Sequence, residues 1–467
     1  MSRESVVLIT LVSYKLLLIL VGFWASRRTH SSEDFFIGGK KLGPWVAAIS
    51  SSASASSAWS LLGVSGAAYT LGYSALWLFP SVISGYLFNW LWLAPRIRTL
   101  ANKTNAITVP ELVAGKDSFS RYISYLTSFI IVFSFAFYIA AQFQAASSTF
   151  SATFDISSTK AIVLGTAIIL LYTLMGGFWA VSVTDTIQGL LMALAAIILP
   201  VFAVIELGGI GALVEQLGNH YTGHQLSFTG EFGGWSAIAF ILGMMGVGFG
   251  YPGQPHVVNR FMAIKDEKSL NQGKYIGIGW PIIVFAGMLI LGMSARILLP
   301  VANDNEQVLF GVTELLFHPV VAGIIIAAVL SAIMSTADSQ LLVAASSVSY
   351  DLKWGASNKA QLLISRLSVA ALSILALLLA LYAPEAIFSR VLFAWAALGA
   401  AFGPLLIILV MGFQVAGKYR LLAILSGFVL TVYFNSLANS PGDVLERVVP
   451  FVVAFLFAWF GREQRTS

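Results

Sequence analysis

Apolar runs of about 20 residues recur along the whole of this 467-residue chain, and they restrict its fold more than any motif does. A helix of that length crosses a hydrocarbon core of about 30 Å. Hydrophobic residues make up 58% of the chain and charged residues only 10%, whereas about a quarter of a soluble domain is charged. Alternating segments of about ten residues, typical of an outer-membrane barrel, are absent. The sequence therefore predicts an all-α polytopic membrane protein.

These runs predict about thirteen transmembrane helices. Their expected centres are Leu16, Leu61, Phe88, Val132, Leu170, Ala195, Gly246, Ala286, Ala328, Leu377, Gly403, Phe428 and Ala454. The first span is expected to remain in the mature protein, because Lys15 interrupts its apolar stretch and no small-residue cleavage site follows it.

Lysine and arginine are distributed unevenly between the predicted loops. If the N-terminus is outside, 20 of the 26 fall in cytoplasmic loops, Arg260 among them, and Lys15 lies within a span. This split obeys the positive-inside rule and predicts a cytoplasmic C-terminus in a bacterial-type inner membrane. The net charge of +5 then follows from topology. The expected partners are the lipid bilayer and a small-molecule substrate; no nucleic acid and no obligatory protein partner are indicated.

The chain contains no cysteine, which excludes disulfides, thiol catalysis and thiolate metal sites. A Ser/His pair, a cluster of metal ligands and a phosphate-binding loop are not evident either. The sequence therefore predicts that the protein is not an enzyme.

Two predicted spans are poorly suited to a continuous helix. The second contains AAISSSASASSAWSLLGVSGAAY, and the seventh contains GMMGVGFGYPGQP, with five glycines and two prolines in thirteen residues. Glycine loosens a helix and proline removes a backbone donor, so we expect unwound turns in both. Such backbone persists at membrane depth only where it is buried in protein or lines a cavity. Close packing of small residues is the alternative explanation of the second span.

The two broken segments begin five spans apart, so they should cross the membrane in opposite directions. This is the pattern of inverted repeats, which place substrate and ion sites near the midplane. The expected division is residues 1–44 for the first helix and a cytoplasmic loop, 45–206 for the first repeat (spans 2–6), 235–414 for the second repeat (spans 7–11), and 415–467 for two C-terminal helices and a short tail.

Residues 327–351 carry hydroxyls and a carboxylate along an otherwise apolar span. Ser335, Asp338 and Ser339 are spaced i, i+3 and i+4, which directs three oxygen-bearing side chains to one face of a helix. A charge near the bilayer centre costs roughly 2.5–3.5 kcal/mol on insertion scales, and oxygen clusters suit hard cations. The segment is consistent with a monovalent cation site, or with a helix that uses hydroxyls for packing.

Five stretches together resemble the sodium/solute symporter family, and within it the sodium/proline symporters. They read DFFIGGKKLGPWVAAIS, GGFWAVSVTDTIQGLLM, GYPGQPHVVNRFMA, SAIMSTADSQLLVAASSVSYDL and FAWAALGAAFGP. The resemblance covers spans two to eleven. It implies a five-plus-five inverted-repeat core of the leucine-transporter type, with one additional span before it and two after.

The resemblance also implies where cations bind. The ligands of its main sodium site would be the backbone carbonyls of Ala53, Ser56 and Ala332 with the hydroxyls of Ser335 and Thr336. A neutral oxygen shell fits weak, releasable binding. A second cation would use Asp185, Ser335, Asp338 and Ser339. Two carboxylates there would also favour a proton, and Asp185 as a simple helix cap is the other alternative.

For the organic substrate, the resemblance implies a pocket between the broken helices. Its lining would be Trp59, Tyr138, Gln142, Tyr251 and Gln254, with Trp395 in an outer gate. Aromatic walls, a few hydrogen-bonding groups and helix N-termini suit a small zwitterion, although each aromatic residue could instead belong to the core or an interfacial belt.

Together these features predict a sodium-coupled symporter that imports a small organic solute, with L-proline preferred, by alternating access. Proline transporters of the family carry an aspartate where this chain has Ala55 and a tryptophan where it has Val247, so another amino acid, pantothenate, a carboxylate or a sugar is the alternative. A proton could replace sodium as the coupling ion. A transporter-like sensory module and a passive channel are alternatives of other classes.

Overall fold

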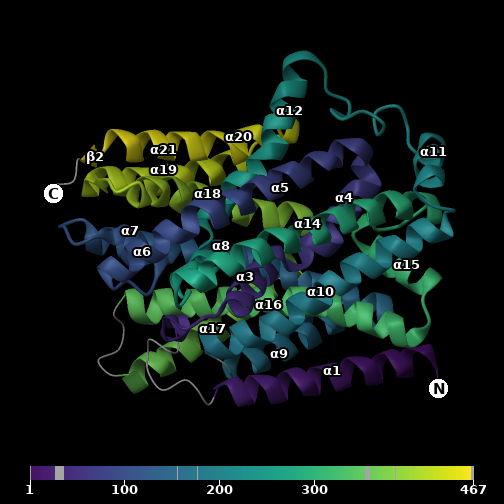
Figure 1. Cartoon of the computed structure of the whole chain (residues 1–467), viewed down its shortest axis with the longest axis horizontal. Helices are drawn as coiled ribbons and strands as arrows, with labels where there is room; N and C mark the ends of the chain where they lie inside the picture. The colour runs from purple at the N-terminus through teal and green to yellow at the C-terminus, as the bar shows by residue number, and fades with distance from the viewer. Residues whose placement is uncertain are drawn as a thin grey trace.

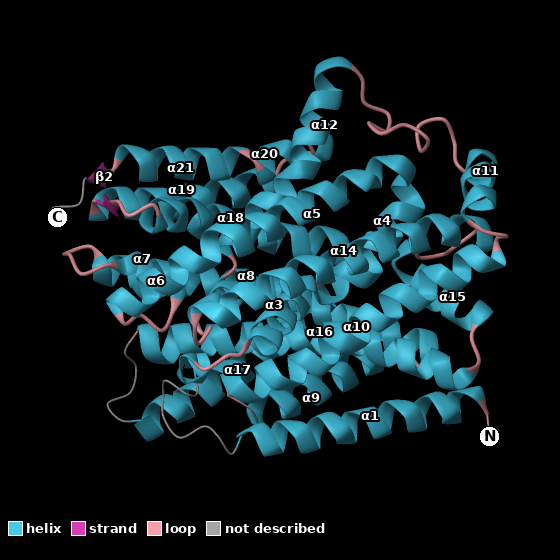
Figure 2. Cartoon of the chain, viewed as in Figure 1, coloured by secondary structure: helices cyan, strands magenta, loops and turns pink. Residues whose placement is uncertain are grey.

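The computed structural model describes residues 2–26, 36–154, 156–175, 177–352, 358–383 and 385–463. Figure 2 shows that helices make up nearly all of this part of the chain. The described strands are β1 (Gln414–Val415) and β2 (Arg462–Glu463), which pair antiparallel near the C-terminus. The all-α prediction is therefore confirmed.

The first half of the chain forms helices that run mostly side by side (Figure 1). They are α1 (Arg3–Ser26), α3 (Pro44–Ala58), α4 (Val64–Leu71), α5 (Leu78–Leu87), α6 (Ala94–Thr104), α7 (Val109–Ala114), α8 (Ser120–Phe154), α9 (Ser158–Met175), α10 (Phe178–Glu206) and α11 (Ile210–His220). Short 3-10 or π turns join some of them: η1 (Gly38–Lys40), η2 (Trp59–Gly63), η3 (Gly72–Trp77) and η4 (Phe88–Leu93).

The second half of the chain is also helical. Its helices are α12 (Gly234–Gly246), α13 (Pro255–Met262), α14 (Glu267–Leu298), α15 (Val308–Leu316), α16 (Pro319–Ser346), α17 (Asn358–Tyr382), α18 (Ile387–Val410), α19 (Gly417–Asn435), α20 (Val444–Arg447) and α21 (Val449–Phe460). The short turns are η5 (Val247–Gly253), η6 (Asn305–Gln307), η7 (Ser347–Asp351) and η8 (Pro441–Asp443).

Every predicted span centre falls within one of these helices or turns. Ten helical segments in the described residues are long and apolar enough to cross a membrane, and one of them, Pro44–Thr104, has 61 residues. That segment folds back on itself, because Ser56 Oγ and Tyr86 OH are only 3.5 Å apart. The apolar part of α9 and the 12 residues of α21 are shorter, so the count of thirteen stays a prediction.

Both predicted interruptions are present. Ser57, near the end of α3, has φ 54° and ψ −175°, so its peptide leaves the helical path before η2 begins. In the second segment, α12 gives way to the 3-10 turn η5 and then to extended Gln254 (φ −84°, ψ 107°), after which Pro255 starts α13. Glycine and proline explain the second break, whereas the first occurs at a serine.

The two interrupted segments run in opposite directions. The Leu42 N–H, just before α3, donates to the Ala263 carbonyl, just after α13, at 3.0 Å. Further along α3, Ser50 accepts from Arg260, which precedes Ala263 in the chain. The beginning of the first segment therefore lies beside the end of the second, as inverted repeats require. The repeat boundaries predicted above stay a prediction.

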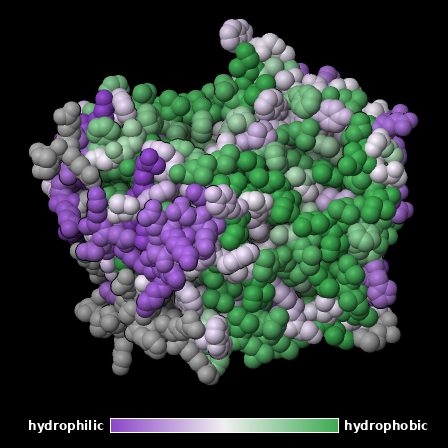
Figure 3. Space-filling model, in the orientation of Figure 1, coloured by the Kyte–Doolittle hydropathy of each residue, from purple (hydrophilic) through white to green (hydrophobic). Residues whose placement is uncertain are grey.

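Helices α3, α10, α14 and α16 occupy the centre of the molecule, where they pack on one another. Helix α1 lies along one edge and packs on α16 and α10, while α19 and α21 line the opposite edge (Figure 1). Figure 3 shows a broad hydrophobic surface across the middle, and hydrophilic atoms gather at the end where α6 lies. This distribution fits a protein that spans a bilayer.

The structure corrects the assignment of Arg260 to a cytoplasmic loop. Arg260 lies in α13 with only 1% of its surface exposed. The positive-inside rule predicted a solvated loop position for Arg260, because the distribution of charges along the sequence carries no information on burial. Of the other residues in that count, Arg27, Arg28, Lys353 and Arg465 lie outside the described residues.

Candidate ion and substrate site

Helix α16 presents hydroxyls to the backbone of α3 just before its break. The Ser335 hydroxyl lies 3.2 Å from the Ala53 carbonyl oxygen and 3.3 Å from that of Ala332. The Thr336 hydroxyl donates to the Ser54 carbonyl at 3.0 Å. All five residues are completely buried. Three of the predicted sodium ligands, Ala53, Ala332 and Ser335, are thus brought together.

Ser56 and Thr336 are placed differently from the other three predicted ligands. The Ser56 carbonyl accepts a hydrogen bond from Ser60 one turn later, and its hydroxyl lies 3.5 Å from Tyr86 OH. Thr336 is next to Ser335 in sequence, yet its hydroxyl bonds Ser54 and not Ala53. Carbonyl and hydroxyl oxygens without a fixed charge suit a weakly held alkali cation, so the residues present fit sodium.

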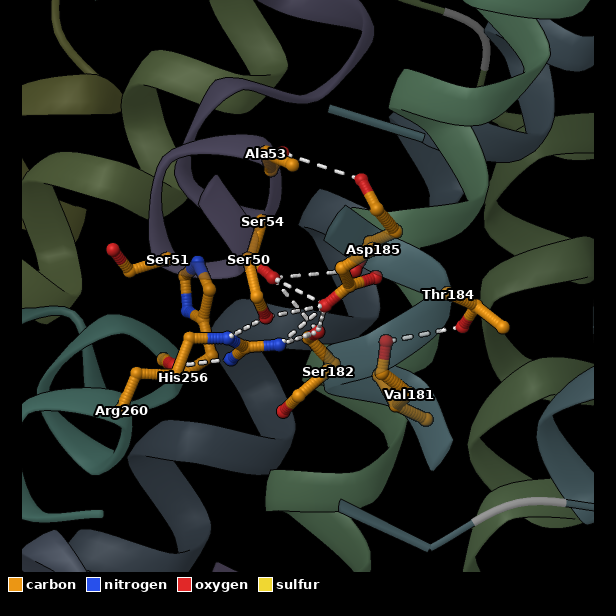
Figure 4. Close-up of polar contacts among 12 residues, drawn as sticks. Ser50, Ser51, Ala53, Ser54, Val181, Ser182, Thr184, Asp185, His256 and Arg260 are labelled. Carbon is orange, nitrogen blue, oxygen red and sulfur yellow. Dashed lines mark hydrogen bonds and ion pairs between the residues drawn. The ribbon is translucent and has the colours of Figure 1, made fainter. Parts of the chain in front are cut away.

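Asp185 of α10 is paired with Arg260 beside this oxygen cluster (Figure 4). The Asp185 Oδ2 and Arg260 Nη2 atoms are 2.6 Å apart, and both side chains are almost fully buried. The same oxygen accepts from Ser50 at 3.0 Å and Ser54 at 3.2 Å, and Ser339 lies 3.4 Å away. The guanidinium therefore occupies the carboxylate that was predicted to hold a second cation.

The other hydrogen bonds of Arg260 reach α3, α13 and α16. Its Nε donates to Ser50 of α3 at 2.6 Å, its Nη1 to the His256 carbonyl of α13 at 2.6 Å, and its Nη2 also to Ser339 of α16 at 2.6 Å. A buried charge is tolerated when it is paired and its donors are satisfied. Together with Asp185 of α10, these contacts tie α3, α10, α13 and α16 at one point.

Asp338 is also fully buried, but it faces another side of α16. Its Oδ1 accepts a hydrogen bond from Thr173 of α9, whereas Ser335 and Ser339 face α3. The three side chains predicted to share one small volume are therefore divided between two faces of the helix. The structure brings Asp185 and Ser339 together and directs Asp338 to different partners.

The break in α3 is held by side chains of α8. Ser57 has a positive φ with extended ψ, a conformation that costs a residue other than glycine about 1–3 kcal/mol. The Ser57 hydroxyl lies 3.1 Å from the Trp59 N–H and accepts from Tyr138 OH at 3.3 Å. Gln142 Oε1 accepts the Ala58 N–H at 3.0 Å. Two predicted substrate residues, Tyr138 and Gln142, thus meet the exposed peptides of the break.

The second break packs against α18. Gln254 Nε2 donates to the Trp395 carbonyl at 2.9 Å, and Trp395 Nε1 donates to the Val247 carbonyl at 3.1 Å. The rings of Tyr251 and Trp395 meet edge to face, with centroids 4.7 Å apart. A Cβ on Gly250 would lie 2.0 Å from Trp395 Nε1, so only glycine permits this approach. The predicted gate residue is therefore fixed to η5.

Tyr86 of α5 joins the two breaks and was not among the predicted site residues. Its ring lies 4.7 Å from that of Tyr251, and its hydroxyl approaches Ser56 Oγ at 3.5 Å and donates to the Ser52 carbonyl at 3.4 Å. Trp59 lies on the other side of the α3 break, where its ring packs 5.6 Å from Phe285 and 5.9 Å from Phe388.

Four further residues near the site were not predicted as site residues from the sequence. Arg260 and His256 lie in the stretch GYPGQPHVVNRFMA, which was already singled out, and their i, i+4 spacing could have indicated one helix face. His256 packs its ring 5.5 Å from Phe135 and 6.4 Å from Tyr138. Ser50 and Ser54 had no individual signal within a serine-rich run.

The structure contains two interrupted antiparallel helices, a buried oxygen cluster at one break, and aromatic rings between the two breaks. These features define the class of protein: it is a membrane transporter with an inverted-repeat core. A sequence model of the sodium:solute symporter family matches residues 35–427. The chain belongs to the sodium:solute symporter family.

Relatives cover nearly the whole chain. The osmoregulated proline transporter of Bacillus subtilis (strain 168) is 34% identical over 463 residues, which are 96% of this chain and 93% of that protein. The sodium/proline symporter of Escherichia coli (strain K12) is 34% identical over 450 residues, 93% of this chain and 89% of that one. The family prediction is confirmed, and with it the prediction of a transporter that is not an enzyme.

Solved structures share the fold. The substrate-bound, outward-open structure of a sodium-coupled sialic acid symporter superimposes with a TM-score of 0.79 at 17% identity and covers 98% of this chain and 99% of that one. A nucleobase–cation symporter in a closed conformation gives 0.57 at 13% identity, covering 92% of this chain and 95% of that one. The predicted leucine-transporter-type fold class is therefore confirmed, and the chain is a multi-pass membrane protein.

Proposed function

We propose that the protein is a sodium-coupled symporter that imports L-proline by alternating access. The observation that carries this proposal is the convergence of the Ser335 hydroxyl with the Ala53 and Ala332 carbonyls at the α3 break. Relatives at 34% identity are named as proline transporters, which supports the choice of solute. We also propose the inner membrane of a bacterial-type cell, with the N-terminus outside.

In this mechanism, sodium enters from outside and binds the oxygens of Ala53, Ser56, Ala332, Ser335 and Thr336. Carbonyls freed by the break need electrostatic partners, so the cation orders the junction of α3 and α16. Proline binds beside it, with Trp59, Tyr138, Gln142, Tyr251 and Gln254 as its walls. Movement of Trp395 with η5 closes the outer side before the inner side opens.

The driving force is sufficient for accumulation. A tenfold sodium gradient contributes about 1.4 kcal/mol, and moving one charge through about 100 mV adds about 2.3 kcal/mol. Together, about 3.7 kcal/mol sustains several-hundredfold accumulation of a neutral solute at one sodium per solute. A passive channel cannot accumulate its solute, so concentrative uptake separates the two classes.

The test is uptake of labelled L-proline into proteoliposomes that contain the full chain. We expect accumulation with an inward sodium gradient and none when choline replaces sodium. A pH gradient imposed without sodium distinguishes protons as the coupling ion. Accumulation that is unchanged in choline contradicts sodium coupling.

Two positions favour a different solute of similar size as the second candidate. Ala55 and Val247 are both 3% exposed and lie near the two breaks, where the proline transporters of the family carry larger polar or aromatic side chains. A smaller side chain reshapes a pocket wall. Competition of labelled proline uptake by a panel of amino acids, pantothenate, short carboxylates and sugars decides between them. If proline is not taken up but another solute of the panel is, the choice of proline is discarded and the sodium-coupled transporter remains.

A further inference from the structure

Helix α16 has a second polar face that takes no part in the proposed transport mechanism. Ser331, Met334 and Asp338 lie at i, i+3 and i+7, on the side that packs against α1 and α9. Asp338 is completely buried, and within the described residues its Oδ2 atom has no hydrogen-bond partner. Thr173 of α9 donates to the other oxygen. A carboxyl group in such surroundings either has a positive charge near it or holds a proton.

Lys15 of α1 points into the protein and not into lipid. The buried stripe of α1 contains Val7, Leu11 and Leu18, which are 3%, 5% and 0% exposed, and Lys15 falls on that stripe at helical spacing. The neighbouring Leu16 is 56% exposed and belongs to the outward face. Lys15 is therefore the cationic residue that α1 directs toward the core.

The contacts of α1 place Lys15 beside this second face of α16. Lys15 Nζ contacts Met334 Sδ, one helical turn from Asp338, and Tyr14 OH lies 2.6 Å from Ser331 Oγ. Met334 and Asp338 are four residues apart on one face of α16, so the Lys15 contact with Met334 directs the ammonium to the face that carries the carboxylate. Two successive polar residues of α1 thus face the polar groups of α16.

We propose that Lys15 is a tethered counter-cation for Asp338, so that the chain's own ammonium fills the second cation position and leaves a single mobile sodium site. The inference rests on the proposed sodium site at the α3 break. Asp185 already has the Arg260 guanidinium at 2.6 Å. Both buried carboxylates that were candidates for a second cation then have a resident positive charge, and neither attracts a second sodium ion.

The experiment counts sodium ions. Equilibrium binding of radioactive sodium to the purified full-length protein, without any organic solute, is expected to give one ion per chain. Lys15→Met is expected to double this number, because it leaves the Asp338 carboxylate without its ammonium. The second ion is expected to be lost again in the double variant Lys15→Met/Asp338→Asn, which is neutral at both positions.

Two controls separate charge from packing. Lys15→Arg keeps the positive charge and is expected to bind one ion. Leu16→Met introduces the same side chain on the outward face of α1 and is expected to leave the count unchanged. If Lys15→Met does not fold, the sodium counts of the wild type and of the double variant still show whether Asp338 binds a sodium ion in the wild-type protein.

Two sodium ions per wild-type chain overturn the proposal, and so does a Lys15→Met count that stays at one. A double variant that binds fewer ions than the wild type also overturns it, because Asp338 would then be a sodium ligand. Absence of any sodium binding contradicts the main sodium site itself, a result distinct from a count of two. Because proline is not used, failure of proline uptake leaves the inference standing.

Discussion

Asp185 and Asp338 are equally buried, but their surroundings differ. Asp185 receives a guanidinium at 2.6 Å and serine hydroxyls from α3 and α16. Asp338 receives one threonine hydroxyl from α9, and its other oxygen has no hydrogen-bond partner within the described residues. The first carboxylate ties the central helices to one another, whereas the second ties α16 to the outer helices of the core.

This difference suggests separate roles for the two faces of α16. The face that carries Ser335, Thr336 and Ser339 meets α3, where alternating access requires movement. The face that carries Ser331 and Asp338 meets helices α1 and α9, which anchor it. Changes on the first face should therefore affect transport, and changes on the second should affect stability and cation count.

The largest effect is expected from Arg260→Ala. Removing one partner of a buried ion pair leaves an uncompensated charge and costs about 3–5 kcal/mol. We expect thermal unfolding of the purified protein at much lower temperature and loss of uptake. The double variant Arg260→Ala/Asp185→Ala should regain part of the stability. If its loss of stability equals the sum of the losses in the two single variants, the two residues are not coupled.

Thr173→Val tests the other carboxylate. Loss of a hydrogen bond to a charged group costs about 1.5–3 kcal/mol of unfolding free energy. The sodium concentration for half-maximal uptake should stay unchanged, because Thr173 lies on the anchoring side. A shifted sodium requirement at normal stability would remove the distinction between the two faces.

Ser335→Ala tests the face that meets α3. Loss of the hydroxyl between the Ala53 and Ala332 carbonyls should raise the sodium concentration for half-maximal uptake about tenfold, equivalent to about 1.4 kcal/mol. Ser331→Ala removes a hydroxyl one turn earlier on the anchoring face and serves as the matched control. Equal sodium requirements in the two variants would mean that the ion site is elsewhere.

Tyr138→Phe should have the smallest effect. Its hydroxyl donates to Ser57 Oγ at the break, and a neutral hydrogen bond contributes about 0.5–1.5 kcal/mol. We expect solute affinity in competition assays to fall about 2–10-fold while sodium activation stays the same. Tyr14→Phe removes the corresponding hydroxyl on the anchoring side and should leave solute affinity unaltered.

Much of the fold could be predicted from local sequence. Apolar length located the helices, and the Gly/Pro content of Val247–Gly253 indicated the second break. The division of Ser335, Asp338 and Ser339 could not be predicted, because a helical wheel gives angles about one axis and not the positions of its neighbours. The burial of Arg260 was missed for the same reason: charge statistics average over loops and ignore a buried partner contributed 75 residues away.

By itself, the sequence determined that this chain spans a bilayer as helices, that two of those helices are interrupted, and that oxygen-bearing side chains lie at membrane depth, because hydropathy and backbone chemistry act locally. Only the tertiary structure decided which cation meets which carboxylate. The energy of a buried charge depends on groups within a few ångströms in space, and in this protein those groups come from helices far apart in the chain.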